Sequence, residues 1–393
     1  MGELPMSIEP FTIAVPDADL ADLRKRLQNT RWPAEIGDNS QWAAGTNLAY
    51  MRELTDYWLN TYDWRERERE MNALPQFKTE IDGVPVHFVH AKGKGPNSMP
   101  IIINHGWPWT FWDMRKIIGP LTDPAAYGGD PADSFDVICP SLPGYAFGSP
   151  LEVPNYYFTQ AGDTYVKLMD QLGYDQFATQ GGDIGSALST MLGHRHPDRV
   201  IGVHIHLLIP LRGNNPAPED FTEEELAGGA KMLEYYNTGS GYMHIQRTKP
   251  QTIAYAMNDS PVGLAAWLVE KRRDWADTGG AIESVWTKDE LLDNVMLYWQ
   301  TQTFLSAAHY YYGPGKTGMA GDFINDDLPM VTVPTGVMQF KGDVWNMPRK
   351  WAERLYNIQS WKVEEKGGHF APAEKPDVLV QDLRDFFRQY RQN

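Results

Sequence analysis

The chain has 393 residues, 42% of them hydrophobic, which is enough to bury the core of one catalytic domain with an inserted subdomain. Its formal net charge of -16 at pH 7 excludes a nucleic-acid partner and disfavours binding to anionic lipid, because an acidic surface repels both. The single cysteine, Cys139, excludes an intramolecular disulfide and is predicted to be a small buried strand residue.

No targeting or membrane segment is expected. Residues 1–16 lack the basic start and the continuous apolar stretch of a signal peptide, and no apolar run approaches about 18 residues. Ser7 lies one position too late for myristoylation of Gly2, so a lipid anchor is not expected either. We therefore expect a soluble protein in the cytoplasm.

The first 78 residues are predicted to form an N-terminal arm. Leucines recur at helical spacing over 17–31, which predicts an amphipathic helix, and a second helix is predicted over 43–61. Alternating apolar and polar residues over 79–89 predict the first hairpin of a sheet. Beyond it, strands alternate with helices, which indicates an α/β fold with a mostly parallel sheet and helices on both faces.

A buried strand is predicted over 100–103, and it leads into the sharp turn HGWP at 105–108. Backbone N–H groups in such a turn can point toward a negatively charged oxygen that develops during a reaction. The N–H of Trp107 is therefore a candidate for one half of an oxyanion hole.

The pentapeptide GGDIG at 181–185 follows a predicted strand over 176–180 and precedes a predicted helix over 184–194. This arrangement resembles the G-x-S-x-G nucleophile elbow of α/β hydrolases, with Asp183 where a hydrolase would have serine. The glycines leave room for a strained turn that lifts the nucleophile out of the sheet. The N–H of Ile184, the next residue, is the candidate for the second oxyanion donor.

After a strand predicted over 200–206, strand character does not resume until Val333, and the intervening segment is predicted to be a helical cap. A capping box at 287–290 and a proline following Ser260 mark the starts of two of its helices. The predicted organisation is an arm over 1–78, a first part of the core over 79–208, a cap over 209–327 and a second part of the core over 328–393, with the cap inserted after the sixth strand.

Two further candidates follow the last predicted strands. Asp343 comes at the carboxyl end of a strand over 333–340, where the acid of a hydrolase triad belongs, and His369 follows a short strand around 361–363. The chain order Asp183, Asp343, His369 is nucleophile, acid and histidine, as in α/β hydrolases.

Taken together, these motifs resemble those of epoxide hydrolases of the microsomal and juvenile-hormone type over nearly the whole chain. In the core and cap they are HGWP at 105–108, LTDP at 121–124, PSLPGYAF at 140–147, YMHIQ at 242–246, TKP at 248–250 and NDSPVGL at 258–264. In the arm they are YDWR at 62–65, PQF at 75–77 and IDG at 81–83.

The resemblance implies hydrolysis of an epoxide to a vicinal diol. An ionised Asp183 would open the ring to form an ester, and His369, oriented by Asp343, would activate the water that hydrolyses it. The family uses two cap tyrosines as proton donors, which by residue match are Tyr242 and Tyr310; a shift of register to Tyr311 or Tyr312 stays open. The implied partners are a small hydrophobic epoxide and water, with no cofactor.

Pro108 and Trp109 are predicted to line the substrate pocket, with Trp109 where the family usually has a small residue. Zinc is not expected at His204 and His206, because no carboxylate or cysteine in the sequence completes a ligand set with them. A haloalkane-type dehalogenase and a non-catalytic ligand-binding protein of the same fold remain as alternatives. Detoxification and biosynthesis both stay open, as does a homodimer.

Overall fold

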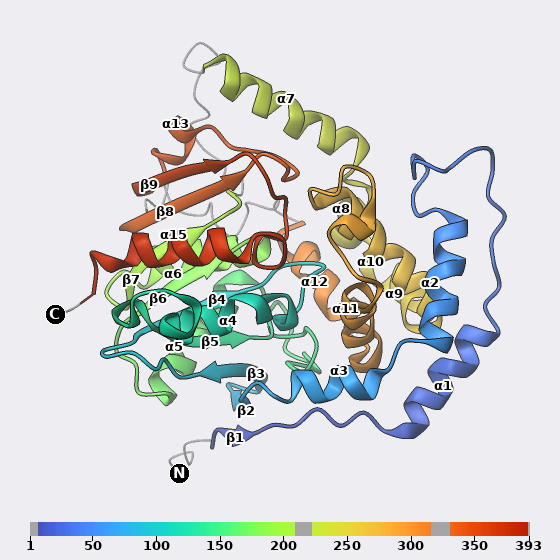
Figure 1. Cartoon of the computed structure of the whole chain (residues 1–393), viewed down its shortest axis with the longest axis horizontal. Coiled ribbons are helices and arrows are strands. Elements are labelled where there is room, and N and C mark those ends of the chain that lie inside the picture. Colours follow the sequence, from blue (N-terminus) through green and yellow to red (C-terminus); the bar gives the residue numbers. More distant parts are fainter. Residues whose placement is uncertain (1–6, 209–221, 316–330, 392–393) are drawn as a thin grey trace.

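A computed structural model describes residues 7–208, 222–315 and 331–391 (Figure 1). Within these residues one sheet runs through the molecule in the strand order β1-β2-β3-β5-β4-β6-β7-β8-β9. The strands are β1 (Glu9–Pro10), β2 (Gln76–Ile81), β3 (Val84–Ala91), β4 (Met99–Asn104), β5 (Phe135–Pro140), β6 (Phe177–Gly181), β7 (Val200–Ile205), β8 (Val331–Phe340) and β9 (Tyr356–Glu364). The pairs from β1 to β5 are antiparallel and all others are parallel, so the loops that follow β4, β6, β8 and β9 and carry the candidate residues leave the sheet at one end.

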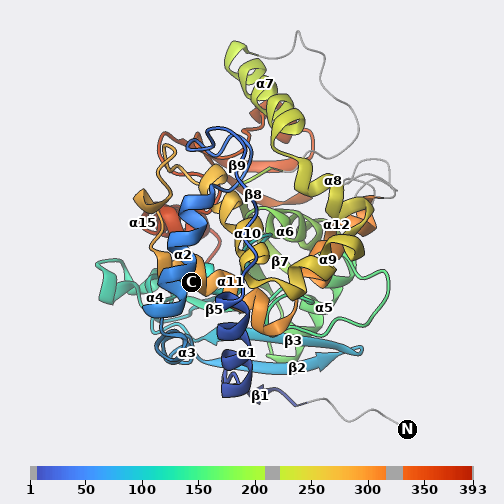
Figure 2. The ribbon, with the colours of Figure 1, turned by 90° about the vertical axis from the view of Figure 1, so that its right-hand side faces the viewer.

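Helices cover both faces of this sheet, as the mostly parallel pattern predicted (Figures 1 and 2). On one face α5 (Phe158–Gln171) packs against α6 (Ile184–Arg195), and on the other α4 (Arg115–Thr122) packs against α15 (Pro376–Arg388). Short helices η1 (Phe111–Met114), η2 (Pro124–Tyr127), η3 (Pro131–Asp133), α13 (Arg349–Ala352) and α14 (Ala371–Glu374) complete the core. The α/β-hydrolase fold is confirmed, and β5, which carries the buried Cys139, lies inside it.

Between β7 and β8 the described residues 222–315 are mostly helical, and they lie over the end of the sheet where the loops after β4, β6, β8 and β9 emerge (Figure 1). The helices are α7 (Glu223–Thr238), α8 (Gly241–Thr248), α9 (Pro250–Asp259), α10 (Pro261–Trp275), η5 (Ile282–Ser284), α11 (Lys288–Thr301) and α12 (Phe304–Gly315). The cap follows the sixth strand when the two-residue β1 of the arm is left aside. The proposed boundaries at 209 and 327 lie outside the described residues.

The N-terminal arm reaches around the cap (Figures 1 and 2). Its helices are α1 (Asp17–Gln28), α2 (Leu48–Asn60) and α3 (Trp64–Met71). α2 begins later than the predicted position 43, because the side chain of Asn47 accepts a hydrogen bond from the N–H of Tyr50 and caps the helix there. The hydroxyls of Tyr57 and Tyr62 donate to Asp289 and Asp293 of the cap, each at 2.9 Å.

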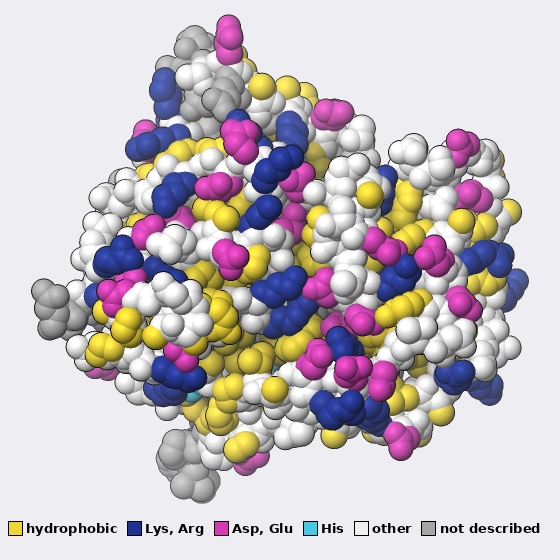
Figure 3. Space-filling view, viewed as in Figure 1, with side chains coloured by type: hydrophobic (Ala, Val, Ile, Leu, Met, Phe, Trp, Pro, Cys, Tyr) yellow, Lys and Arg dark blue, Asp and Glu magenta, His cyan; other side chains and the backbone are white. Residues whose placement is uncertain are grey.

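The surface seen in Figure 3 carries both signs of charge, and its lysines and arginines are interspersed with acidic residues. On that face they form no basic stripe. Among the described residues no helix is both long enough and apolar enough to cross a membrane.

Candidate active site

Asp183 lies between β6 and α6 in a backbone conformation that L-residues rarely adopt, with φ 53° and ψ -130°. The neighbouring glycines allow this turn to fit. A Cβ on Gly185 would lie 2.2 Å from the carbonyl oxygen of Asn104, and one on Gly182 would lie 1.9 Å from His206 Nε2. The elbow predicted from the GGDIG motif is therefore present, and it presents the Asp183 carboxylate to the pocket.

The turn after β4 approaches this carboxylate closely. The N–H of Trp107 donates to Asp183 Oδ1 at 2.8 Å, and a Cβ on Gly106 would lie only 2.4 Å from that same oxygen. Ile184 is the first residue of α6, so its N–H is one of the helix-terminal donors that have no partner within the helix. Both predicted oxyanion donors thus lie next to Asp183. The N–H of Trp107 is hydrogen-bonded to it, and the N–H of Ile184 belongs to the first residue of the helix that follows it.

His369 stands between the two carboxylates of the predicted triad. Its Nδ1 is 2.8 Å from Asp343 Oδ1, and its Nε2 is 3.4 Å from Asp183 Oδ2. Burial alone would lower the pKa of His369, but the charge and hydrogen bond of Asp343, together with the nearby charge of Asp183, raise it to about 10. With both carboxylates ionised, the imidazole is therefore protonated at neutral pH.

Two phenol side chains of the cap face this carboxylate. The ring of Tyr242 stacks on Trp107 at 4.8 Å between centroids, and Tyr311 meets both rings edge-on. Burial raises the pKa of each hydroxyl well above its usual value, and the charge of Asp183 acts on both in the same direction. Both groups remain protonated at neutral pH and can donate a proton or a hydrogen bond. The hydroxyl of Tyr235 in turn donates to Tyr242 at 3.2 Å.

Tyr310 takes a different position from the one expected. Its ring packs against Tyr145 and Phe158, and its buried hydroxyl has no hydrogen-bond partner. The ionisable groups that act on it are Tyr156 and Tyr165, not Asp183. Successive helical residues point about 100° apart, so only one of Tyr310 and Tyr311 can aim its hydroxyl at the nucleophile. The position of Tyr311, on which the charge of Asp183 acts, makes it the candidate for the second proton donor in place of Tyr310.

The sequence contained a signal for this correction. Phe304, Ala307, Ala308 and Tyr311 recur at the spacing of one helical face, and all four are buried. The two small alanines mark the face of α12 that packs against the rest of the molecule, and Tyr311 belongs to that face.

The pocket next to Asp183 encloses about 480 Å³ of empty space, its mouth included. Apart from Asp183, its wall is apolar or phenolic, and it is made of Phe158, Ile184, Ala187, Leu207, Tyr242, Met243, Tyr310, Tyr311 and Trp345. Pro108 and Trp109, which were predicted to line it, do not.

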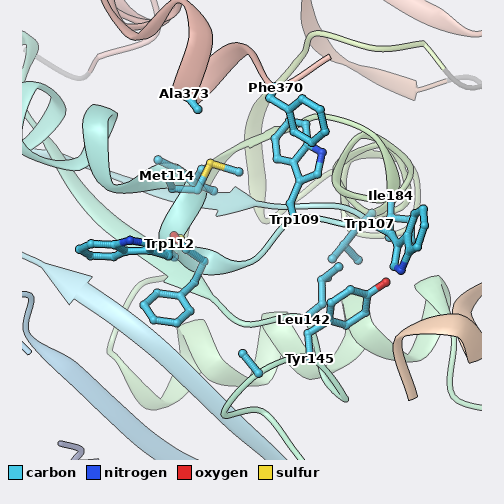
Figure 4. Packing of buried hydrophobic residues seen from close by; sticks show 14 of the residues in the cluster. Trp107, Trp109, Trp112, Met114, Leu142, Tyr145, Ile184, Phe370 and Ala373 are labelled. Carbon is cyan, nitrogen blue, oxygen red and sulfur yellow. The ribbon is translucent and has the colours of Figure 1, made fainter. Parts of the chain in front are cut away.

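Trp109 instead lies behind the catalytic histidine. Its ring stands edge-on to His369 at 5.4 Å and stacks on His206 at 5.6 Å, and Figure 4 shows it beside Phe370, away from Trp107 and Ile184. The carbonyl of Pro108 accepts from Asn294 and Arg272 of the cap, so this residue also turns away from the pocket. A large residue fits at position 109 because it fills the core beneath His369.

His204 on β7 and His206 just after it each have a partner other than a metal ligand set. Nε2 of His204 is paired with Asp382 at 2.8 Å, and Nδ1 of His206 is 3.0 Å from the amide of Gln180. Among the described residues no three histidine, cysteine or acidic side chains gather closely enough to hold a metal ion.

These geometries define the chain as an α/β hydrolase whose elbow presents a carboxylate. Its residues 8–114 match the family model "Epoxide hydrolase N terminus", and residues 99–239 match "alpha/beta hydrolase fold". It is 36% identical to epoxide hydrolase 1 of Sus scrofa over 97% of this chain and 88% of that protein. It is 34% identical to juvenile hormone epoxide hydrolase 2 of Ctenocephalides felis, over 96% of this chain and 84% of that protein.

Solved structures agree. The juvenile hormone epoxide hydrolase from Bombyx mori superposes with a TM-score of 0.88 at 28% identity, covering 98% of this chain and 95% of that one. The Aspergillus niger epoxide hydrolase superposes with a TM-score of 0.86 at 29% identity, covering 98% and 97%. The chain therefore belongs to the epoxide hydrolase family of enzymes, which confirms the resemblance drawn from its motifs.

Proposed function

We propose that this enzyme converts a small hydrophobic epoxide and water to a vicinal diol through a covalent ester on Asp183. The observation that carries the proposal is that the Asp183 carboxylate has nitrogen donors on one side and phenol hydroxyls on the other. The Trp107 N–H and His369 lie on its core side, and the phenols of Tyr242 and Tyr311 belong to the pocket wall. The apolar lining favours an uncharged substrate.

In the first step Asp183 attacks an epoxide carbon, and the carbon–oxygen bond of the ring breaks. An ionised carboxylate is already a nucleophile at neutral pH, so no base is needed. The electron pair of the broken bond stays on the epoxide oxygen, which takes a proton from Tyr242 or Tyr311. Two donors aimed at the same oxygen stabilise its developing charge.

The first step also prepares the second. Once Asp183 is an ester, its charge is gone, and the interactions by which it raised the pKa of His369 are lost. His369 can then release a proton, which replaces the one given up by the tyrosine. The neutral imidazole, held by Asp343, removes a proton from water, and the resulting hydroxide attacks the ester carbonyl. The oxyanion is held by Trp107 and Ile184, and collapse releases the diol and restores Asp183.

A trapping experiment tests this sequence. Replacing His369 with glutamine should leave ring opening possible and block ester hydrolysis, so the protein should gain the mass of one substrate on the peptide that carries Asp183. Intact-mass spectrometry after mixing with styrene oxide detects it. Wild-type enzyme in oxygen-18 water should release a first diol without label, since its new oxygen comes from Asp183. A labelled first diol would mean that water attacks the epoxide directly.

The same assay separates the alternatives. A chloroalkane that alkylated Asp183 and released chloride would point to a dehalogenase, because that reaction uses the same nucleophile and histidine. A ligand-binding protein would give no covalent mass with either reagent. The phenols of Tyr242 and Tyr311 favour the epoxide, whose leaving oxygen needs a proton whereas chloride does not.

A further inference from the structure

The loop that carries His369 is fixed by a carboxylate outside the triad. Glu374 Oε2 accepts from the N–H of Gly368 at 2.9 Å, and its Oε1 accepts from the N–H of Phe370 at 2.8 Å. The N–H of His369 itself donates to the carbonyl of Trp275 at 2.9 Å. Three consecutive backbone donors around the catalytic histidine are therefore satisfied by only two residues.

The same carboxylate also holds the cap. Glu374 Oε2 accepts a third hydrogen bond, at 2.8 Å, from the N–H of Asp277, which follows α10. Asp277 returns a bond to the loop, because its Oδ2 accepts from the N–H of Gly367 at 3.0 Å. A Cβ on Gly368 would lie 2.6 Å from the Trp275 carbonyl, so the two backbones touch here. Glu374 thus joins the histidine loop and the cap into one unit.

Among the residues that the structure describes, Glu374 bonds only to backbone groups at the boundary of core and cap. In the described part of the chain it forms no ion pair, and all three of its bonds come from backbone N–H groups. A carboxylate that accepts several backbone N–H bonds holds those peptides in a defined orientation, because each bond is directional and charge-assisted. The orientation fixed in this way is that of the peptides on both sides of His369.

We propose that Glu374 is a positioning residue that aims His369 at the Asp183 ester and thereby makes ester hydrolysis depend on a seated cap. This inference rests on the two-step reaction proposed above. Ring opening depends less on the contact, because Asp183 is held by the elbow and by the N–H of Trp107, and its proton donors lie on α8 and α12, none of which bonds to Glu374. Ester hydrolysis does require it, because His369 must hold a water against the ester carbonyl.

Single-turnover experiments with excess enzyme separate the two steps. Styrene oxide is mixed with the full-length enzyme and quenched over time, and intact-mass spectrometry follows the formation and decay of the ester. Glu374→Ala should slow ester decay by about tenfold to a hundredfold, as expected when a catalytic group is misplaced by about 1 Å, while ester formation stays near the wild-type rate. Glu374→Gln keeps the shape of the side chain and one acceptor oxygen, so its rate of ester decay should lie between those of the wild type and Glu374→Ala.

Glu290 offers a matched control. It also links the cap to the core, since Oε1 pairs with Arg115 at 2.5 Å and Lys116 at 2.9 Å, but it contacts no catalytic loop. Glu290→Ala should lower Tm and leave the ratio of the two rate constants unchanged. The inference is overturned if Glu374→Gln and Glu374→Ala slow both steps equally, or if Glu290→Ala changes the ratio as much as they do. Failure of wild-type and His369→Gln protein to form any ester would overturn the proposed function instead.

Discussion

The elbow around Asp183 and the phenol wall that faces it, made of Tyr242 and Tyr311, are built in different ways. The elbow is made by five contiguous residues. A Cβ added to Gly181 or Gly185 would lie 2.1 or 2.2 Å from a backbone oxygen, and one added to Gly182 would lie 1.9 Å from the side chain of His206. The wall comes from α8 and α12, and its hydroxyl positions are set by ring packing on Trp107. One region is fixed by covalent geometry and steric exclusion, and the other by tertiary contacts.

The elbow should therefore be intolerant of the smallest substitution. Gly185→Ala places a Cβ 2.2 Å from the backbone oxygen of Asn104, where nothing flexible can move aside. We expect loss of activity and a free energy of unfolding lower by about 3 kcal/mol. Chemical denaturation and ester formation are the measurements. Gly162→Ala in α5 is the control, because the added Cβ would lie 3.7 Å from its nearest neighbour, Leu188 of α6, and the change should raise stability by about 1 kcal/mol.

Substitutions in the phenol wall should leave the fold intact and slow the reaction instead. Tyr242→Phe and Tyr311→Phe should each slow ester formation by about tenfold to a thousandfold, and the double variant should nearly abolish it, because each removes one donor to the epoxide oxygen. Tyr310→Phe is the internal control, since its hydroxyl makes no hydrogen bond. A larger defect in Tyr310→Phe than in Tyr311→Phe would reverse the correction made here.

The ion pairs of His369 with Asp183 and Asp343 should make the stability of the fold depend on pH. The folded-state pKa of about 10 lies above the ordinary value of 6.5, so this group stabilises the fold fully below about pH 6.5 and loses that contribution as pH rises through 10. The Tm advantage of wild type over His369→Gln should therefore shrink steadily from pH 6 to pH 10. Thermal unfolding of both proteins in matched buffers measures it, and a constant difference would contradict the ion pairing.

A smaller effect is expected where the cap supports the oxyanion turn. The hydroxyl of Tyr298 donates to the Trp109 carbonyl at 3.1 Å, so Tyr298→Phe leaves a buried acceptor without this partner. We expect a loss of about 1 kcal/mol in stability and about fivefold in turnover. Tyr356→Phe removes a buried hydroxyl bonded to Thr190 at 3.0 Å, far from the turn, and should lower stability alone.

The contrast between the two regions explains what the sequence predicted. The triad and the oxyanion turn could be predicted because each of their residues follows a strand of a known fold. Those residues are Asp183, Asp343, His369 and the turn at Trp107, and the glycines and the histidine beside the strands are visible in the sequence itself. The structure places all four together. Tyr310 was chosen over Tyr311 because the sequence does not show how α12 is rotated, and that rotation decides which of the two hydroxyls faces Asp183. Pro108 and Trp109 were misplaced because the direction of a loop side chain is decided by what packs against it, here His206 and His369.

The role of Glu374 could not be predicted from the sequence either. Its partners are backbone N–H groups of the histidine loop and of the cap, which no side-chain pattern reveals. A sequence read for residue types can find a carboxylate that reacts. It cannot find one whose task is to hold peptide groups from two distant segments.

The clasp of the arm on the cap has a consequence for the order of folding. Tyr62 bonds to Asp293, and Arg26 bonds to Asp259, so the partners are 231 and 233 positions apart in the chain. The ribosome makes the arm first, yet the surface that the arm clasps is synthesised more than half a chain later. Closing loops of this length carries an entropic cost that only a formed cap can offset. We expect the arm helices of the nascent protein to remain undocked until the cap is complete, although they are synthesised before it.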